Sequence, residues 1–241
     1  MLDLTSILGC FSMKCHLYLA MFLRIGLIHY GEYQDNRLMV KFTDVDYRVF
    51  TDAARHMWAE GGESPYHRHT YRYTPILAWL MIPNLTISPL FGKYLFCLLD
   101  IFAGYLIYTF VKNCYRCHFG PNKIEFQARV CAFLWLYNPL VFAVSARGNA
   151  ESIVVTLVLI TMHLFSEKVF VLAGIAFGLS IHFKIYPIIY SISFYLALSD
   201  KEGIWSLFQV NANASTNNFR ITASLSMNLM ALSIADYPGP D

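Results

Sequence analysis

One long apolar run constrains this chain more than any other feature. It reads FGKYLFCLLDIFAGYLIYTFV, from Phe91 to Val111, and carries one carboxylate, Asp100, near its middle. A helix that crosses a membrane needs about 20 predominantly apolar residues, and a run of this length is a mark of membrane proteins. The run therefore predicts a transmembrane helix.

Composition and the other apolar runs extend this prediction. Charged residues make up 14% of the chain and hydrophobic residues 56%, whereas a soluble domain is about 25% charged. The length of 241 residues has room for roughly six or seven crossings, and we expect an all-α polytopic membrane protein. The net charge of +2 gives no reason to expect a nucleic-acid partner. Further spans are expected at residues 15–31, 130–143, 153–165, 169–181 and 188–198.

Two segments depart from this pattern. Residues 74–90, TPILAWLMIPNLTISPL, contain three prolines, which favours a re-entrant or interfacial element over a crossing. After about Gly203 the sequence becomes rich in Asn, Ser and Ala. We therefore expect a transmembrane domain over residues 1–203 and a divergent, poorly ordered tail over residues 204–241.

If residues 74–90 do not cross, counting the spans puts three polar segments on one side of the membrane. They are the loop containing TDVD (residues 43–46), SARGNAES (145–152) and HFKIYP (182–187). The basic loop after residue 111 falls on the other side, which the positive-inside rule makes cytoplasmic. We therefore expect the three segments to share the opposite side, where they can line one polar cavity.

The first of these segments contains Asp44 and Asp46. From Tyr47 onward, apolar residues recur at helical spacing until Gly61 and Gly62, which predicts an amphipathic helix along a membrane face. Asp46 is expected to cap this helix, and Asp44 is expected in extended chain without a capping role. A carboxylate there can act as a general base or hold a divalent ion. The alternative is that Asp44 is merely solvated.

Other polar side chains beside the apolar runs are candidates for substrate binding. Charges so close to hydrocarbon are costly unless they face partners or a watery cavity, and arginine binds phosphate at two points. The alternatives are an aromatic belt with basic flanks and side chains that reach to the interface. Asp100 is expected to pair within the helix bundle. The candidates are Tyr66, Arg72, Tyr73, Arg147, Asn149, Glu151, His182, Lys184 and Tyr186.

Five motifs in one order resemble those of a known family. They are KFTDVDYRVFTDAAR, SPYHRHTYRYTP, FGKYLFCLLD, NPLVFAVSARGNAESI and HFKIYP, and they cover about residues 23–198. The chain resembles the GPI mannosyltransferase I catalytic subunits, which are similar to the GT-C glycosyltransferases that use lipid-linked sugar donors. The resemblance implies a GT-C-like helical bundle with a long first lumenal loop that carries amphipathic helices.

The resemblance also implies a reaction and its partners. The reaction is an inverting transfer of the first mannose from dolichol-phosphate-mannose to glucosaminyl-phosphatidylinositol. Its place is the lumenal face of the endoplasmic reticulum membrane, beside membrane lipid and with a small single-span accessory subunit. Asp44 and Asp46 match the family's DxD motif, with Asp44 as general base and Asp46 as a group that positions either Asp44 or the acceptor. The expected phosphate-binding cations are Arg72, Arg147 and Lys184. No cofactor is expected to be required, although a DxD motif is compatible with a divalent metal.

Two alternative functions stay open. The polar residues can line the path of a transporter or channel, or the chain can be a non-catalytic membrane fragment that binds partner subunits. Family members are about twice as long as this chain, and the tail after Gly203 is expected to match none of their sequence. A truncated form with little activity of its own is therefore expected.

Overall fold

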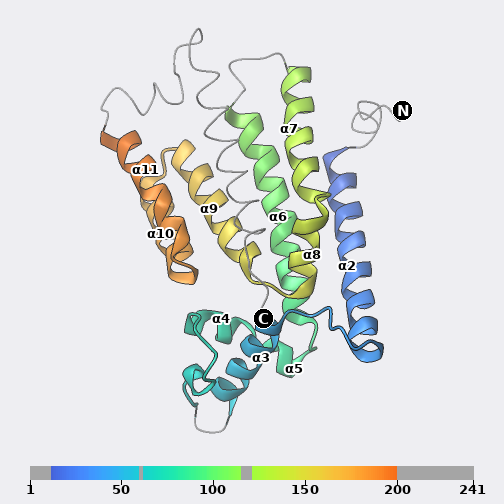
Figure 1. Ribbon diagram of the computed structural model, residues 1–241. Helices are drawn as coiled ribbons and strands as arrows, with labels where there is room; N and C mark the ends of the chain where they lie inside the picture. Colours follow the sequence, from blue (N-terminus) through green and yellow to red (C-terminus); the bar gives the residue numbers. More distant parts are fainter. Residues whose placement is uncertain (1–11, 60–61, 115–120, 200–241) are drawn as a thin grey trace. The chain divides into compact units, whose positions relative to one another are not determined.

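A computed structural model describes residues 12–59, 62–114 and 121–199 (Figure 1). The regular secondary structure of these residues is helical and includes no strand, which confirms the predicted all-α class. The chain forms two compact units, residues 1–188 and 189–241. The described part of the second unit contains α11 (Tyr190–Ser199).

The first unit combines long helices with a group of short ones between α2 and α6 (Figure 1). The long helices are α2 (Met13–Arg37), α6 (Phe91–Cys114), α7 (Pro121–Leu136), α9 (Glu151–Ser166) and α10 (Phe170–Phe183). The shorter elements are α3 (Val45–Trp58), η1 (Pro65–His67), α4 (Pro75–Leu80), α5 (Pro83–Thr86) and α8 (Pro139–Arg147). The short helix η2 (Tyr186–Ile189) begins in the first unit, and its last residue belongs to the second.

The length of each helix decides whether it can cross a membrane alone. Among the described residues, α6 is long and apolar enough, and α7 with α8 would be a second crossing if the bent pair forms one span. The apolar helices α9 and α10 have 16 and 14 residues, fewer than the about 20 that a crossing needs. The expected six or seven crossings therefore stay a prediction. Residues 74–90 form two short helices, as their prolines predict.

The span expected over residues 130–143 consists of parts of two helices rather than one helix. The helix already begins at Pro121, ends at Leu136, and resumes as α8 after a bend of 49°. Pro139 has no N–H and cannot continue the hydrogen-bond ladder of α7. The side chain of Asn138 instead accepts a hydrogen bond from the amide of Leu140 (3.0 Å) and caps the new helix.

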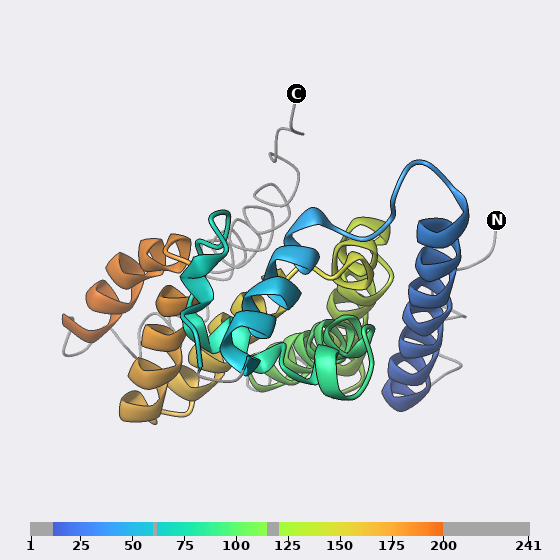
Figure 2. The same ribbon diagram turned by 90° about the horizontal axis from the view of Figure 1, so that it is seen from below.

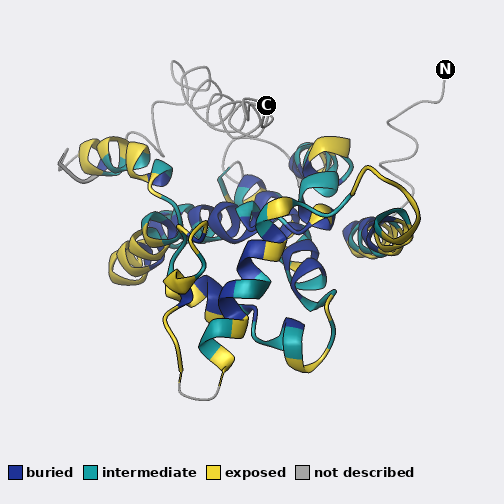
Figure 3. Ribbon diagram, turned by 60° about the horizontal axis from the view of Figure 1, so that its bottom comes forward, coloured by how far each residue is buried: buried dark blue, intermediate teal, exposed yellow. Residues whose placement is uncertain are grey.

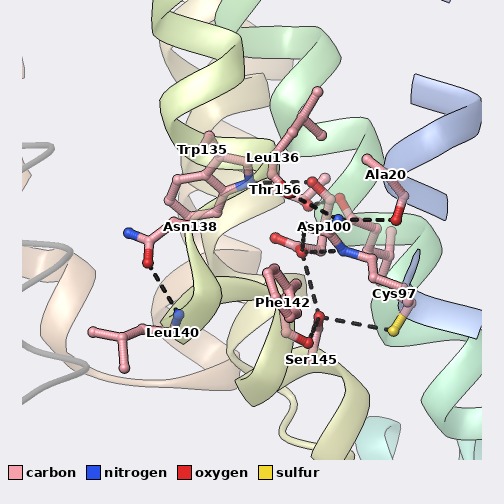
Figure 4. Close-up of polar contacts among 12 residues, drawn as sticks. Ala20, Cys97, Asp100, Trp135, Leu136, Asn138, Leu140, Phe142, Ser145 and Thr156 are labelled. Atoms are coloured by element: carbon pink, nitrogen blue, oxygen red, sulfur yellow. Dashed lines mark hydrogen bonds and ion pairs between the residues drawn. The ribbon is translucent and has the colours of Figure 1, made fainter. Parts of the chain in front are cut away.

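A buried ion pair stabilises this bend (Figure 4). Nε and Nη2 of Arg24, on α2, donate to Oδ2 of Asp100, on α6, at 2.9 and 2.6 Å. Nη1 of Arg24 donates to the carbonyl oxygen of Leu136 (3.0 Å). In a continuous helix this carbonyl would accept the amide hydrogen of Leu140, but that amide donates to the side chain of Asn138 instead. The pair confirms that Asp100 has a partner inside the bundle, and it joins α2, α6 and the end of α7.

The amphipathic helix expected after Tyr47 is present as α3. It crosses the ends of longer helices, as the view along them shows (Figure 2). Tyr47 and Phe50 belong to a buried cluster with Leu77 of α4, Phe96 of α6 and Ile153 of α9. The short helices carry buried residues on one side and exposed ones on the other (Figure 3). This packing fixes where the first turn of α3, with its two aspartates, lies.

Candidate active site

Asp44, rather than Asp46, is the N-cap of α3. Asp44 has extended backbone angles (φ −61°, ψ 143°), and its carboxylate accepts a hydrogen bond from the amide of Asp46 at 3.4 Å. Asp46 lies inside the first helical turn. The expectation that Asp46 caps the helix and that Asp44 has no capping role is therefore wrong, because the helix begins at Val45. A special role for Asp44 must rest on its other contacts.

Those contacts come from the turn between α8 and α9. Nδ2 of Asn149 donates to Oδ2 of Asp44 at 3.2 Å. The backbone amide of Asp44 donates to the carbonyl oxygen of Arg147 (3.0 Å), and Nε of Arg147 donates to the carbonyl oxygen of Phe42 (3.0 Å). The TDVD and SARGNAES segments, which the sequence placed on one side of the membrane, are thus bound to each other along a short stretch.

Gly148 allows this close approach. It adopts a left-handed conformation (φ +94°) that ends α8, a conformation that glycine tolerates and other residues rarely adopt. A Cβ atom there would lie 2.4 Å from Cδ2 of Tyr47. Tyr47 is itself buried, and its hydroxyl donates to the carbonyl oxygen of Pro89 (2.7 Å). Burial raises the pKa of Tyr47 to about 12, so the ring is a neutral anchor.

We expect Gly148→Ala to destabilise the protein. The unfavourable backbone conformation alone costs about 1–3 kcal/mol, and the clash with Tyr47 adds to that cost. Thermal unfolding of the detergent-purified protein measures the effect. Gly174→Ala is the matched control, because Gly174 has ordinary helical geometry in α10 and open space around its Cβ position. Equal melting temperatures for the two variants would contradict the close contact at Gly148.

The second carboxylate, Asp46, contacts the SPYHRHTYRYTP segment. The hydroxyl of Tyr73 donates to Oδ2 of Asp46 at 2.5 Å. The Tyr73 ring packs edge-on against Phe50 of α3, with centroids 4.8 Å apart. Tyr71, which is 3% exposed, lies beside Tyr73 at 5.8 Å. The buried neighbours orient Tyr73, and Tyr73 orients Asp46.

A third set of polar contacts joins the SARGNAES segment to the HFKIYP segment. Nζ of Lys184 forms an ion pair with Oε1 of Glu151, and the hydroxyl of Tyr186 donates to Oε2 of the same carboxylate (3.2 Å). The Glu151 backbone amide donates to Oδ1 of Asn149 (3.1 Å), which links this group to Asp44. Lys184 was expected to bind the leaving phosphate, but its charge is already balanced by Glu151.

The remaining predicted residues lie at the surface. Arg147 and Tyr66 are exposed, and the Tyr66 ring lies 5.9 Å from that of Tyr71. Arg72 and His182 are exposed too. The structure therefore links eight of the predicted site residues through hydrogen bonds or an ion pair, whereas the other three, Tyr66, Arg72 and His182, have surface positions. The linked residues are Asp44, Asp46, Tyr73, Arg147, Asn149, Glu151, Lys184 and Tyr186.

Sequence analysis missed a polar cluster directly beneath the TDVD segment. Lys93, which is 2% exposed, donates to Oγ1 of Thr43 (2.5 Å), and the Thr43 hydroxyl donates to Asp35. Oδ1 of Asp35 also accepts the amide hydrogen of Phe42 (2.5 Å). Burial alone would raise the pKa of Asp35, but the hydrogen bonds from Thr43 and Phe42 outweigh it and lower that pKa. Lys93, the lysine of the FGKYLF motif, was the sequence feature that could have indicated this cluster.

Comparisons with known proteins bear on what this arrangement does. A family model described as Mannosyltransferase (PIG-M) matches residues 144–238, a range that runs past residue 203 into the segment expected to diverge. The GPI mannosyltransferase 1 of Dictyostelium discoideum is 42% identical over 198 residues, which are 82% of this chain and 43% of the relative. No solved structure matches.

Other relatives agree with this one. The GPI alpha-1,4-mannosyltransferase I catalytic subunit of Danio rerio is 47% identical over 180 residues, or 75% of this chain and 44% of the relative. The Saccharomyces cerevisiae GPI mannosyltransferase 1 is 41% identical over 175 residues, or 72% and 41%. The chain spans about half the length of the curated relatives that it matches. These matches confirm the resemblance seen in the five motifs: most of this chain is similar in sequence to part of the GPI mannosyltransferases, and its residues 144–238 match the PIG-M mannosyltransferase family model.

Proposed function

We propose that this chain carries the catalytic carboxylates of an enzyme that transfers the first mannose from dolichol-phosphate-mannose to glucosaminyl-phosphatidylinositol. The observation that carries the proposal is the contact of Asp44 with Asn149 and with the backbone of Arg147. It joins two motifs, 105 residues apart, in a chain whose relatives are named GPI mannosyltransferases. The transporter alternative, in which Asp44, Arg147 and Lys184 line a path, gains no support, because the charge of Lys184 is paired with Glu151.

The reaction is a single displacement with inversion at the sugar. Asp44 takes the proton of the acceptor hydroxyl as its oxygen attacks the anomeric carbon. The bond from that carbon to the phosphate oxygen breaks, and dolichyl phosphate leaves with the electron pair. Asn149 and the Asp46 amide hold the Asp44 carboxylate in one orientation, which a reaction that depends on alignment requires. Asp46, itself oriented by Tyr73, positions the acceptor.

The leaving phosphate needs positive charge beside it. Arg147 suits this role, because its Nε atom is bound to the Phe42 carbonyl while the side chain is exposed beside Asp44. Arg72, exposed next to Tyr73, is the second cation. Lys184 and Tyr186 hold the Glu151 carboxylate and thereby position the turn that carries Asn149. The reaction needs no metal, since a phosphate monoester is already a stable leaving anion.

The proposed setting is the endoplasmic reticulum membrane, which the chain crosses several times. The helix α6 has the length and composition for a crossing, and the short helices between α2 and α6 lie at one end of it (Figure 1). The TDVD, SARGNAES and HFKIYP segments face the lumen in this arrangement, where they meet the lipid-linked donor and the acceptor. A small single-span subunit accompanies the chain.

The topology gives a direct test. Single cysteines at the exposed positions Met39, Arg147 and Ile185 should react with an impermeant thiol reagent only from the lumenal side, in a background without native cysteines. A cysteine at exposed Lys168, between α9 and α10, should react only from the cytosol. Cytosolic labelling at any one of the first three positions would contradict a shared lumenal site.

The activity is tested in a chimaera of full family length. Residues 23–198 of this chain replace the matching segment of the Danio rerio relative, in microsomes that lack the endogenous enzyme. We expect mannose transfer that requires both dolichol-phosphate-mannose and glucosaminyl-phosphatidylinositol. A chimaera that is expressed normally but transfers no mannose, beside an active Danio rerio control, would contradict the proposal.

A further inference from the structure

Three side chains of types that can bind a metal ion lie close together, outside the proposed active site. They are His56 in the last turn of α3, Glu63 in the following loop and His67 in η1. One donor atom from each lies within 4.8 Å of the other two. None of the three contacts a substrate in the proposed mechanism, and sequence analysis did not single them out.

Both histidine rings place their Nδ1 atom beside the same carboxylate oxygen of Glu63. Nδ1 of His56 lies 2.9 Å from Oε2 of Glu63, and Nδ1 of His67 lies 3.3 Å from the same oxygen. Zinc binds histidine nitrogen and carboxylate oxygen at about 2.0–2.2 Å, so the donors of a tetrahedral site lie about 3.3 Å apart. The existing separations are close to that value, and small rotations of the side chains bring all three donors around one ion.

The backbone holds the three residues in place. The amide of Glu63 donates to the carbonyl oxygen of His56 (3.1 Å), and the amide of His67 donates to that of Ser64 (3.1 Å). The Ser64 side chain also accepts the Tyr66 amide at the start of η1.

We propose that His56, Glu63 and His67 form a binding site for a divalent transition-metal ion, with zinc as the best match. Two imidazoles and a carboxylate are a ligand set that zinc uses, and solvent completes the coordination. The side chains are between 37% and 58% exposed, so an ion can enter. The ion would fasten the end of α3 to the loop that continues to Tyr71 and Tyr73, and Tyr73 holds Asp46.

The test uses the purified full chain in detergent micelles with Zn²⁺ or Co²⁺ as the only added metal. After equilibration and desalting, we expect the wild type to retain one more equivalent of zinc than His56→Ala or His67→Ala. Co²⁺ should give a visible absorption band typical of tetrahedral nitrogen and oxygen ligands, and Glu63→Gln should weaken it. His69→Ala is the control, because His69 is exposed in the same loop but outside the cluster.

The comparison with His69→Ala shows which result would overturn the proposal. If the wild type, His56→Ala and His69→Ala retain equal zinc, the three residues form only a hydrogen-bonded ion-pair cluster. Glu63→Gln separates loss of a ligand from loss of folding, because glutamine keeps the shape of this exposed side chain and removes its negative charge. This measurement does not depend on mannose transfer, so its failure leaves the proposed function untouched.

Discussion

Replacing Asp44 by Asn should lower the rate of mannose transfer about a hundredfold to ten-thousandfold, the usual loss when a general base is removed. Asparagine caps helices as well as aspartate does, so the variant keeps the N-cap of α3 and loses the ability to accept a proton. Initial rates in the chimaera, at matched protein levels and saturating donor, measure the effect.

Two further variants separate catalysis from folding. Asp52→Asn removes a carboxylate from the same helix, where Asp52 pairs with exposed Arg55, and should leave the rate nearly unchanged. Asp46→Asn weakens the hydrogen bond from Tyr73 without touching the cap, and it should lower the rate less than Asp44→Asn. If Asp44→Asn transfers mannose at the wild-type rate, Asp44 is not the base.

Arg24→Met should destabilise the fold by about 3–5 kcal/mol, because it leaves the buried Asp100 carboxylate without its partner. The side chains of both residues are nearly inaccessible to solvent, at 0% and 2%. The variant also leaves the Leu136 carbonyl oxygen at the α7–α8 bend without its donor. Unfolding in mixed micelles, followed by circular dichroism, measures the loss.

Two controls test this interpretation. Arg55→Met breaks an exposed ion pair with Asp52, a kind of pair worth about 0–1 kcal/mol. The double variant Arg24→Met/Asp100→Leu removes both charges and should be more stable than Arg24→Met alone, because no unpaired charge stays buried. A double variant as unstable as the sum of its parts would show that the two charges do not interact.

Local patterns in the sequence predicted the elements that depend on local forces. The spacing of Tyr47, Phe50, Ala54 and Trp58 predicted α3. The first three are buried as that spacing predicts, but Trp58, the last residue of the helix, is exposed. The uninterrupted run from Phe91 predicted α6. The break between α7 and α8 was missed because residues 130–143 are apolar on both sides of Pro139. Its stability also depends on Arg24, more than a hundred residues earlier in the chain, and no local pattern contains that contact.

The candidate site shows the same limit. Asp44 and Asp46 are both plausible caps for a helix that starts nearby, and the sequence favoured the wrong one. The actual start is fixed by the Arg147 carbonyl, which accepts the Asp44 amide hydrogen, and by Asn149. Counting spans placed these segments on one side of the membrane, but only the folded chain shows which side chains meet. The pairing of Lys184 with Glu151 was likewise invisible in the sequence.

The central claim is that Asp44 and Asn149 act as one catalytic unit, and a double-mutant cycle tests it most directly. Residues that act together give non-additive losses. Asn149→Ala should lower kcat in the otherwise wild-type chimaera and have little further effect when Asp44 is already Asn. Circular dichroism of each variant checks that the helices are intact. If the two losses multiply as independent effects, Asn149 does not act through Asp44, and the account of the site is wrong.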